Sequence, residues 1–438
     1  MERQLSFQMR ILIIVLMAVN IIFLTADKNI IGAVLIEVEK EFGVDSSDIG
    51  FMSFLFTMVG AVVSIVWGYY TDKVDRKKLF ALSVFAAEIP CALTYFAPNF
   101  TVFFILRILT GIGVGAAFPI VFSMLGDIFD KRGRTFAAAI LTTCWGIGGL
   151  FGVMVAGYSL GAGLGWRLPF VLIAAPNFLL IIIFYFIIPE IPKGASEEAL
   201  KELIRQGLRY PGIIKIKDYV RLAKIKTNLL LFIQGLAGNL PWGALFLLIK
   251  FLQTVRGFDV NTATTVYGIF GVGAATGGIL GGAIGGKLFI MRPSYQPMFS
   301  GISTIIGAIM TLSILYLVPN DFIVVAATGF LGAAWASITG ANIRNMLLSV
   351  NRPEDRGAIF SIFNLTDSVG FGIGEFIAGS LAVTIGITHS LGFSFACWIP
   401  CGIIIIIAAR YFGGDVAKLD ASMQEAAVAM KREQQKNI

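Results

Sequence analysis

Charge, histidine and paired cysteines are all scarce in this 438-residue chain. Charged residues make up 14% of the chain, against about 25% in a typical soluble domain. Hydrophobic residues account for 57%. This composition excludes a water-soluble globular protein.

The four cysteines lie inside apolar runs and form no CxxC pair, which excludes a disulfide framework and a structural zinc site. The single histidine, His389, falls in a predicted outer loop, where we expect it to be solvated. No P-loop, Ser-His-Asp set or HExxH motif occurs. We therefore expect neither ATP-driven pumping nor enzymatic catalysis, and no cofactor or bound metal.

Apolar residues and positive charge are what the chain has in excess. Its mean hydropathy is +0.83, its formal net charge is +7 and its pI is about 9.2. A basic excess indicates nucleic-acid binding only when it forms a patch on a soluble face, and the sequence holds no soluble module of that size. We therefore expect a polytopic membrane protein that binds no nucleic acid.

A membrane-spanning helix needs about 20 apolar residues, and the sequence contains twelve such runs. They start near Ile11, Asp48, Leu79, Thr101, Thr135, Arg167, Thr227, Thr262, Gln296, Phe322, Gly357 and Thr388. With a cytoplasmic N-terminus, 27 of the 34 Lys and Arg residues lie in inner segments, and only Lys40, Arg167 and Arg256 lie outside. This alternation follows the positive-inside rule and places both termini in the cytoplasm.

One long polar stretch, from Glu190 to Lys226, separates the twelve runs into two sets of six. We expect an N-terminal six-helix bundle (1–189), a cytoplasmic linker (190–226), a C-terminal six-helix bundle (227–412) and a cytoplasmic tail (413–438). An internal repeat at an offset of 222 residues supports this division. It matches Gly148, Gly152, Gly157 and Arg134 with Gly370, Gly374, Gly379 and Arg356. The sequence thus predicts an all-α membrane protein built from two parallel six-helix repeats.

The loop after the second predicted span reads Gly-Tyr-Tyr-Thr-Asp-Lys-Val-Asp-Arg-Lys-Lys from Gly68 to Lys78. It resembles the GxxxD(R/K)xGR(K/R) signature of the major facilitator superfamily, a family of transporters. The resemblance implies a cytoplasmic gate, in which Asp72 accepts hydrogen bonds from a helix N-terminus and Arg76 bridges to a carboxylate. Asp75 departs from the signature, because it stands where the second glycine is usual.

The fourth predicted span carries a second resemblance. Arg107 to Gly113 read Arg-Ile-Leu-Thr-Gly-Ile-Gly, which is similar to the RxxxGxG pattern of the superfamily. The basic loop that follows the span, from Asp127 to Arg134, resembles its inner loop. The gate residues implied by these two resemblances and by the repeat are Gly68, Asp72, Arg76, Asp127, Arg134 and Arg356.

Two charged residues lie deep in predicted spans. At ~1.5 Å per residue, Asp27 lies about 14 Å and Arg107 about 9 Å inside the outer boundary. An arginine inside a span is unfavourable by about 3 kcal/mol and normally faces a cavity or a partner. Two interpretations are open: Asp27, Lys28 and Arg107 form a proton switch, or Asp27 and Arg107 form a permanent ion pair that locks two helices.

The stretch from Thr25 to Arg76 is most similar to Spinster-type transporters of lysolipids and sphingolipids. The likeness rests on an Asp-basic pair followed by Ile-Gly-Ala-Val-Leu from Ile31, and on Glu-Phe-Gly-Val from Glu41. Lys28 stands where these transporters have arginine, and Val114 where they usually carry a glutamate. Glu88, in the third predicted span, either replaces that missing carboxylate or only satisfies a neighbouring polar side chain.

The second half contributes two further candidates for proton or substrate contact. Asp367 lies about 15 Å and Glu375 about 27 Å into the span that starts near Gly357. Lys250 and Arg344 fall near span ends, as is typical of snorkelling or gating residues. Asn239 and Pro241 interrupt the seventh predicted span, as in the broken helices that line transporter cavities.

Our leading hypothesis is a proton-coupled secondary transporter that works by alternating access and moves an amphipathic anion, such as a lysophospholipid. The predicted site residues are Asp27, Lys28, Glu88, Arg107, Asp367 and Glu375. The alternatives are a carrier of small organic anions or drugs, and a membrane sensor or scaffold that does not transport. The expected partners are a small amphipathic or anionic substrate, protons and membrane lipids. We expect a monomer in a bacterial inner (plasma) membrane.

Overall fold

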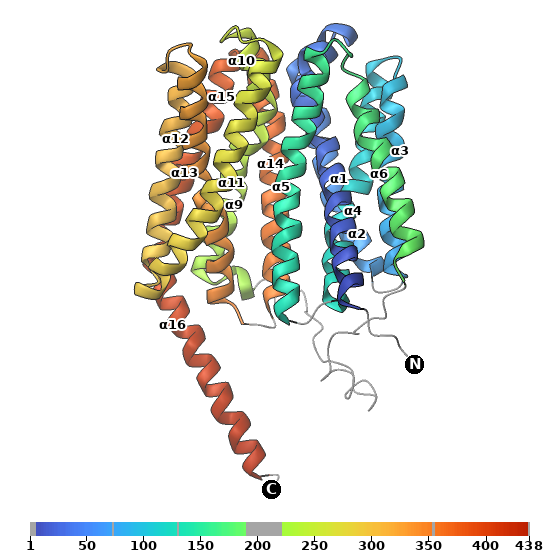
Figure 1. The fold of residues 1–438 in the computed structure, drawn as a ribbon. Coiled ribbons are helices and arrows are strands. Elements are labelled where there is room, and N and C mark those ends of the chain that lie inside the picture. The colour runs from blue at the N-terminus through green and yellow to red at the C-terminus, as the bar shows by residue number, and fades with distance from the viewer. Residues whose placement is uncertain (1–5, 72–73, 129–130, 190–220, 353–354, 437–438) are drawn as a thin grey trace. The chain divides into compact units, whose positions relative to one another are not determined.

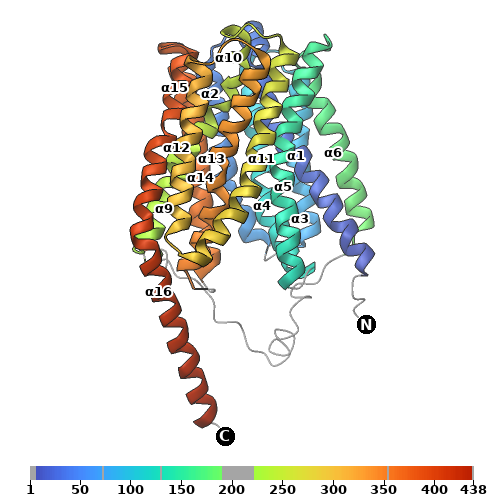
Figure 2. The same cartoon turned by 60° about the vertical axis from the view of Figure 1, so that its left-hand side comes forward.

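The computed structural model describes residues 6–71, 74–128, 131–189, 221–352 and 355–436. Within these ranges the chain forms α-helices and short 3-10 turns and no strands. The first half contains α1 (Phe7–Phe42), α2 (Ser46–Thr71), α3 (Arg76–Leu93), α4 (Phe100–Ile128), α5 (Lys131–Gly161) and α6 (Leu168–Ile187) (Figure 1). The second half contains α9 (Lys226–Ala244), α10 (Leu248–Thr254), α11 (Val260–Met291), α12 (Tyr295–Tyr316), α13 (Phe322–Val350), α14 (Arg356–Thr384), α15 (Ile387–Ala396) and α16 (Trp398–Lys436) (Figure 2).

Eleven helical stretches among the described residues are long and apolar enough to cross a membrane. They confirm a multi-pass, all-helical membrane protein. Eleven of the twelve predicted runs coincide with such a stretch, and the run near Gly357 is the exception. It corresponds to α14, which carries Asp367 and Glu375. The count of twelve spans and the cytoplasmic position of both termini therefore stay predictions.

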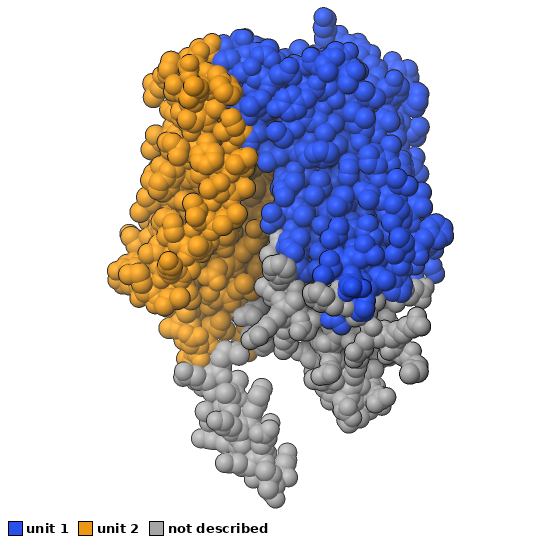
Figure 3. All heavy atoms as spheres, viewed as in Figure 1, with its two compact units in different colours: residues 1–211, 243–268, 372–390 blue, residues 212–242, 269–371, 391–438 orange. Residues whose placement is uncertain are grey.

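The chain divides by its internal contacts into two compact units (Figure 3). Unit 1 comprises residues 1–211, 243–268 and 372–390, and unit 2 comprises residues 212–242, 269–371 and 391–438. Unit 1 therefore holds α1 to α6 together with α10, the start of α11, the end of α14 and the start of α15. The division into bundles at residues 189, 226 and 412 stays a prediction from the sequence.

Glycines of α4 let this helix pack closely on both α2 and α3. A Cβ atom on Gly111 would overlap the backbone of Phe56 in α2, and one on Gly115 would overlap Gly60 in the same helix. A Cβ atom on Gly113 would overlap the backbone of α3 at Ser83 and Ala87. Small residues allow helices in membranes to approach in this way. This packing explains the Gly-x-Gly spacing that follows Arg107.

Glycines of α5 bring this helix against the polar segment of α1. Gly148 contacts Ile22 and Thr25, and Gly152 contacts Ala26, in each case closely enough that a Cβ atom would overlap. In unit 2, Gly370 of α14 packs in the same manner against Leu236 of α9. The matched glycines 148 and 370 thus each pack against the first helix of their half of the chain.

The predicted interruption of the seventh span is present. Helix α9 ends at Ala244, three residues after Pro241, and a 3-10 turn from Leu245 to Leu247 connects it to α10. Proline supplies no backbone N–H and clashes with the preceding turn, so regular helix geometry is disturbed beside it. The break allows α10 to pack with α1 in unit 1.

We expect Gly152→Val to lower the free energy of unfolding by ~1–3 kcal/mol, because the new side chain overlaps Ala26 and the core cannot absorb it. Thermal unfolding of the purified protein in detergent measures the effect. Gly146→Ala is the matched control on the same helix, since nothing lies within 4 Å of a Cβ atom there. Equal unfolding midpoints for Gly152→Val and the wild type would contradict the close packing of α1 and α5.

Candidate functional site

Asp27 of α1 and Arg107 of α4 form a buried ion pair in unit 1. Arg107 Nη1 donates to Asp27 Oδ1 at 2.5 Å, and Arg107 Nη2 donates to the backbone oxygen of Asp27 at 3.1 Å. The side chains are only 2% and 0% exposed, respectively. The structure thus brings together two of the charges that the sequence placed deep in the first half of the chain.

The polar side chains around Asp27 stabilise α1 rather than break it. Thr25 Oγ1 donates to the carbonyl of Ile21 at 2.7 Å, and Asn29 Nδ2 donates to the carbonyl of Thr25 at 2.8 Å. Because these side chains bond to their own helix, α1 continues unbroken through this segment. Asp27 is left to project toward α4.

A second buried carboxylate, Glu88 of α3, adjoins the ion pair. Asn177 Nδ2 of α6 donates to Glu88 Oε1 at 2.5 Å, and both residues are fully buried. Ligand-type atoms of Asp27, Glu88 and Cys91 lie within 4.8 Å of one another. Glu88 therefore satisfies a polar neighbour and lies close to the Asp27 carboxylate, while its replacement of the missing glutamate stays a prediction.

Three acceptor oxygens in this cluster have no hydrogen-bond partner among the described residues. They are Asp27 Oδ2, Glu88 Oε2 and Asn177 Oδ1. Burying an acceptor without a donor is unfavourable by ~1–3 kcal/mol, and by more when the acceptor is charged. Two carboxylates and one guanidinium leave one negative charge uncompensated, and a bound proton would both cancel that charge and supply a donor.

Among the described residues, Asp27, Glu88 and Cys91 are the one group with the ligand types and spacing of a metal site. The guanidinium of Arg107 is already hydrogen-bonded to Asp27 there. Its positive charge opposes a divalent cation at the same carboxylates. The arrangement fits a proton better than a metal ion.

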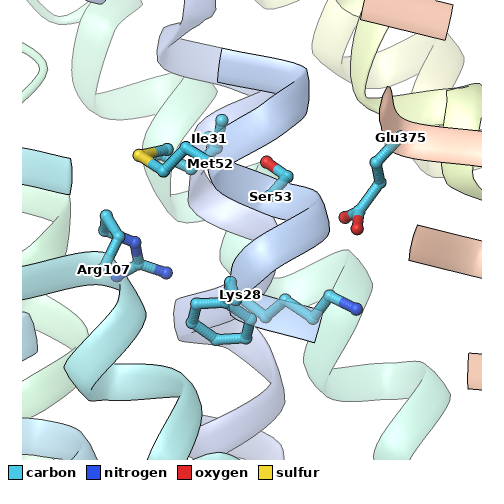
Figure 4. Close-up of a pocket in the computed structure, with 7 residues that line it drawn as sticks. Lys28, Ile31, Met52, Ser53, Arg107 and Glu375 are labelled. Carbon is cyan, nitrogen blue, oxygen red and sulfur yellow. The ribbon is translucent and has the colours of Figure 1, made fainter. Parts of the chain in front are cut away.

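Lys28 and Glu375 line a small cavity next to the ion pair, together with Arg107 and Ser53 (Figure 4). The cavity has room for about one water molecule. Thr57 Oγ1 of α2 donates to Glu375 Oε2 at 2.8 Å, which ties α14 to α2 within unit 1. Glu375 is only 5% exposed.

Phe56 of α2 connects the cavity with the carboxylate cluster. Its ring centroid lies 5.1 Å from Arg107 Cζ and 6.0 Å from Lys28 Nζ. Both distances fall within the range of cation–π attraction. One aromatic ring therefore contacts the cation of the ion pair and the cation of the cavity.

Lys250 of α10 joins a further ion pair near the end of α1. Its ammonium lies 2.5 Å from Glu39 Oε2 and 2.8 Å from the hydroxyl of Ser46. Glu41, two residues after Glu39 in α1, pairs with Arg167 at 2.6 Å. Lys250 was expected to snorkel or to gate; its ammonium is paired with Glu39, and a gating role stays a prediction.

Asp367 belongs to unit 2 and has its own surroundings. Asn239 Nδ2 of α9 donates to Asp367 Oδ1 at 2.8 Å and to the carbonyl of Gly235 at 2.9 Å. Asp367 is half-buried. Asp367 is therefore a separate candidate in unit 2. The other five predicted site residues lie in unit 1: Asp27, Lys28, Glu88, Arg107 and Glu375.

The predicted cytoplasmic gate is described only in part. Gly68 faces Pro119 of α4, and Arg76 Nη1 lies 3.4 Å from the carbonyl of Ser123. Asp75, where the signature has glycine, caps α3 by accepting from the backbone N–H of Lys77 at 2.9 Å. Asp72 and the side chains of Asp127, Arg134 and Arg356 lie outside the described residues.

Sequence reasoning missed Asn177, Thr57 and Phe56. An asparagine in the otherwise apolar stretch of α6 is a usable signal, because buried amides in membranes need a partner. Thr57 and Phe56 carry no such signal, since both residue types are common in membrane helices that have no ligand.

These features of fold and site agree with comparisons to known proteins. The sequence profile of the Major Facilitator Superfamily matches residues 16–310, well over half of the chain. The protein belongs to this transporter superfamily.

Within the superfamily the chain is similar to Spinster-type proteins. It is 22% identical to mouse protein spinster homolog 3 over 347 residues, 75% of this chain and 66% of that protein. The solved structure of a bacterial homolog of the human lysosomal transporter Spinster, in an inward-facing and unoccupied conformation, matches with a TM-score of 0.81. At 17% identity, over 94% of this chain and 99% of that chain, it shows a shared fold.

Other relatives carry different descriptions. The probable sulfoacetate transporter SauU of Cupriavidus necator is 24% identical over 368 residues, 82% of this chain and 78% of that protein. The putative metabolite transport protein YaaU of Escherichia coli is 29% identical over 181 residues. That match spans 40% of each chain.

We expect Arg107→Met to lower the free energy of unfolding by ~3–5 kcal/mol, because it leaves the Asp27 carboxylate buried without its cation. The double variant Asp27→Asn/Arg107→Met should recover more than half of that loss, since both charges are then gone. Denaturant unfolding in detergent measures both variants. A double variant that is less stable than Arg107→Met would contradict the direct pairing.

Proposed function

We propose that the protein is a secondary active transporter that works by alternating access and couples the movement of an amphipathic anion to protons. The proposal includes twelve spans in two six-helix bundles, 1–189 and 227–412, with both termini in the cytoplasm. It places the protein in a bacterial inner membrane, as a monomer. Membership of a transporter superfamily supports it, as does the buried site in unit 1.

The observation that carries proton coupling is the Asp27–Glu88–Arg107 cluster. A permanently fixed ion pair needs one carboxylate for one guanidinium, and this site holds two carboxylates. The second carboxylate leaves an acceptor, Glu88 Oε2, without a donor among the described residues. Carboxylates that share a buried site characteristically share protons, since both cannot ionise without compensation. This supports a proton-binding site over a static lock.

The anionic character of the substrate is supported by Lys28. Lys28 and Arg107 both line the cavity, and Arg107 is bonded to Asp27. Apolar side chains of Ile31, Met52 and Phe56 complete the lining. The cavity as it stands holds about one water molecule, so a substrate must widen it; the mixture of a cation and apolar side chains then supports an amphipathic anion, such as a lysophospholipid.

A carrier of small organic anions is the second candidate function. The relative SauU, described as a probable sulfoacetate transporter, covers 82% of this chain and supports it. The similarity to mouse spinster homolog 3 supports the lipid. A third alternative, a sensor or scaffold that does not transport, predicts no flux of either type of substrate.

Transport is tested with purified protein in liposomes that carry a pH gradient. We expect the gradient to drive uptake of fluorescent lysophosphatidylglycerol, and benzoate to compete poorly. Strong uptake of labelled benzoate without lysolipid movement would favour the small-anion carrier. No flux of either compound would reject transport of an anion.

We expect Asp27→Asn and Glu88→Gln each to reduce gradient-driven uptake at least tenfold, because the shared proton is lost from the cluster. Uptake measured at equal internal and external pH should change much less. Glu37→Gln, which alters another carboxylate of α1 outside the cluster and the cavity, is the matched control and should behave as the wild type. Full pH-gradient dependence in both Asp27→Asn and Glu88→Gln would reject this cluster as the coupling site.

A further inference from the structure

Three helices of unit 1 meet at their ends on the side where the N-terminus lies. There α1 and α3 begin and α6 ends, and the first turns of α1 lie beside the last turns of α6 in both views (Figure 1 and Figure 2). One apolar cluster joins them, with Ile13 from α1, Phe80 from α3 and Phe184 from α6. The rings of Phe80 and Phe184 are in contact at 5.2 Å between centroids. The three helix ends therefore form one packed surface.

Arg10 of α1 brings a positive charge to this surface. It stands three residues before Ile13, and hence on the same face of the helix. Its side chain is half-buried, and its Nε atom is buried without a hydrogen-bond partner among the described residues. A buried N–H group without an acceptor is unfavourable. The guanidinium of Arg10 therefore has an unsatisfied donor at the packed end of α1.

Lys77 of α3 brings a second positive charge. Its ammonium lies 4.9 Å from the ring centroid of Tyr185 in α6, within the range of cation–π attraction. The neighbouring carboxylate of Asp75 accepts from the backbone N–H of Lys77 at 2.9 Å and lies 3.8 Å from the ammonium of Lys78. Among the described residues, no carboxylate forms an ion pair with the ammonium of Lys77.

These polar side chains lie at the level where a membrane meets water. Arg10, Lys77 and Tyr185 each fall within the first or last three residues of a stretch that is long and apolar enough to span a bilayer. Tyrosine is enriched at this level, where the lipid headgroups lie. A headgroup is therefore the group that meets these two cations in a membrane.

The same helix ends also turn apolar side chains outward. Exposed residues of this kind are Ile11 and Val15 on α1 and Ile182 and Phe186 on α6. A small water-soluble anion leaves these side chains uncovered, whereas the acyl chains of a lipid cover them. The surface thus combines cations that lack an acid with an apolar face that lacks a cover.

We propose that the ends of α1, α3 and α6 form a binding site for an anionic phospholipid of the bilayer. Its phosphate accepts from Arg10 Nε and from the ammonium of Lys77, and its acyl chains lie along the exposed apolar side chains of α1 and α6. Arginine suits this role because its Nε and Nη donors form a planar fork that matches two phosphate oxygens. With the N-terminus in the cytoplasm, as proposed above, the lipid belongs to the inner leaflet.

The charges at the site select an anionic headgroup over a zwitterionic one. A zwitterionic headgroup adds an ammonium, which needs an acid to receive it. Asp75 is the described acid nearest in sequence to Lys77, and it already caps α3 and faces Lys78. Basic positions between membrane helices recognise anionic headgroups in the same way. The site does not depend on which substrate the protein moves.

Binding is tested by native mass spectrometry of the full chain in detergent. The probes are dioleoylphosphatidylglycerol, dioleoylphosphatidylcholine and, as a soluble phosphate, glycerol 3-phosphate. We expect the wild type to retain phosphatidylglycerol about tenfold more tightly than phosphatidylcholine, because only the first is anionic. Glycerol 3-phosphate should not be retained at the same concentration. Phosphatidylglycerol should also raise the midpoint of thermal unfolding, because it binds the folded state.

The double variant Arg10→Gln/Lys77→Gln should retain the two lipids equally. Arg10→Lys keeps the charge but loses the planar fork, and should bind phosphatidylglycerol about threefold more weakly than the wild type. Lys224→Gln/Lys287→Gln is the matched control, since it removes the same charge from exposed lysines of unit 2, and should behave as the wild type. A single symmetric peak in size-exclusion chromatography checks that each variant is folded.

Equal retention of the two lipids by the wild type would overturn the proposal. So would an unchanged preference in the folded double variant, or an equal loss in the control, which would show attraction by overall charge alone. Retention of glycerol 3-phosphate as tight as that of phosphatidylglycerol would assign the site to a soluble phosphate. If the double variant does not fold, wild-type affinity in Arg10→Lys decides against the site. None of these outcomes touches the transport proposal, because neither Arg10 nor Lys77 belongs to the carboxylate cluster or to the cavity.

Discussion

The neutralisation of charge away from water is the constraint on which the rest of unit 1 depends. Arg107 is the largest charged side chain that is fully buried, and its bond to Asp27 is what makes that burial tolerable. Replacing such a pair by apolar residues often stabilises a protein, so stability alone does not account for it. The additional carboxylate of Glu88 makes the site more unfavourable still unless a proton is present. This excess of buried carboxylate is the reason that we propose a change of protonation at this site.

Small residues give this charged site its geometry. Glycines of α4 allow this helix to pack closely on α2 and α3, and glycines of α5 pack closely on α1 beside Asp27. A Cβ atom at these positions would overlap the neighbouring helix, so larger residues would push the helices apart. The apolar character of the surrounding core then removes the alternative of solvation. Packing and electrostatics in this unit therefore depend on each other, because close packing at the glycines limits the space around the charged side chains.

Much of this arrangement is predictable from the sequence, and the reasons differ between residues. Hydropathy and the loop charges predict the helical, multi-pass fold, because each helix must satisfy its own backbone in lipid. Depth along a span identifies Asp27 and Arg107 as partners, since their heights are similar. The contact of Glu375 with Thr57 is not predictable in this way, because it depends on how α14 packs on α2. Glu88 was identified without its partner, as nothing local to α3 indicates Asn177.

The contact between α2 and α14 has a consequence for the cost of moving these helices. Where Gly50 meets Gly379, the two helices are in direct backbone contact, and no side chains lie between them. Separating the helices there would expose peptide groups and only a small apolar area to water. Peptide groups are readily hydrated. Phe376 of α14 contributes an apolar contact here, since its ring packs against Phe51 and Phe54 of α2. Separating α14 from α2 would therefore expose little apolar surface at Gly50 and Gly379 and more at the three phenylalanine rings.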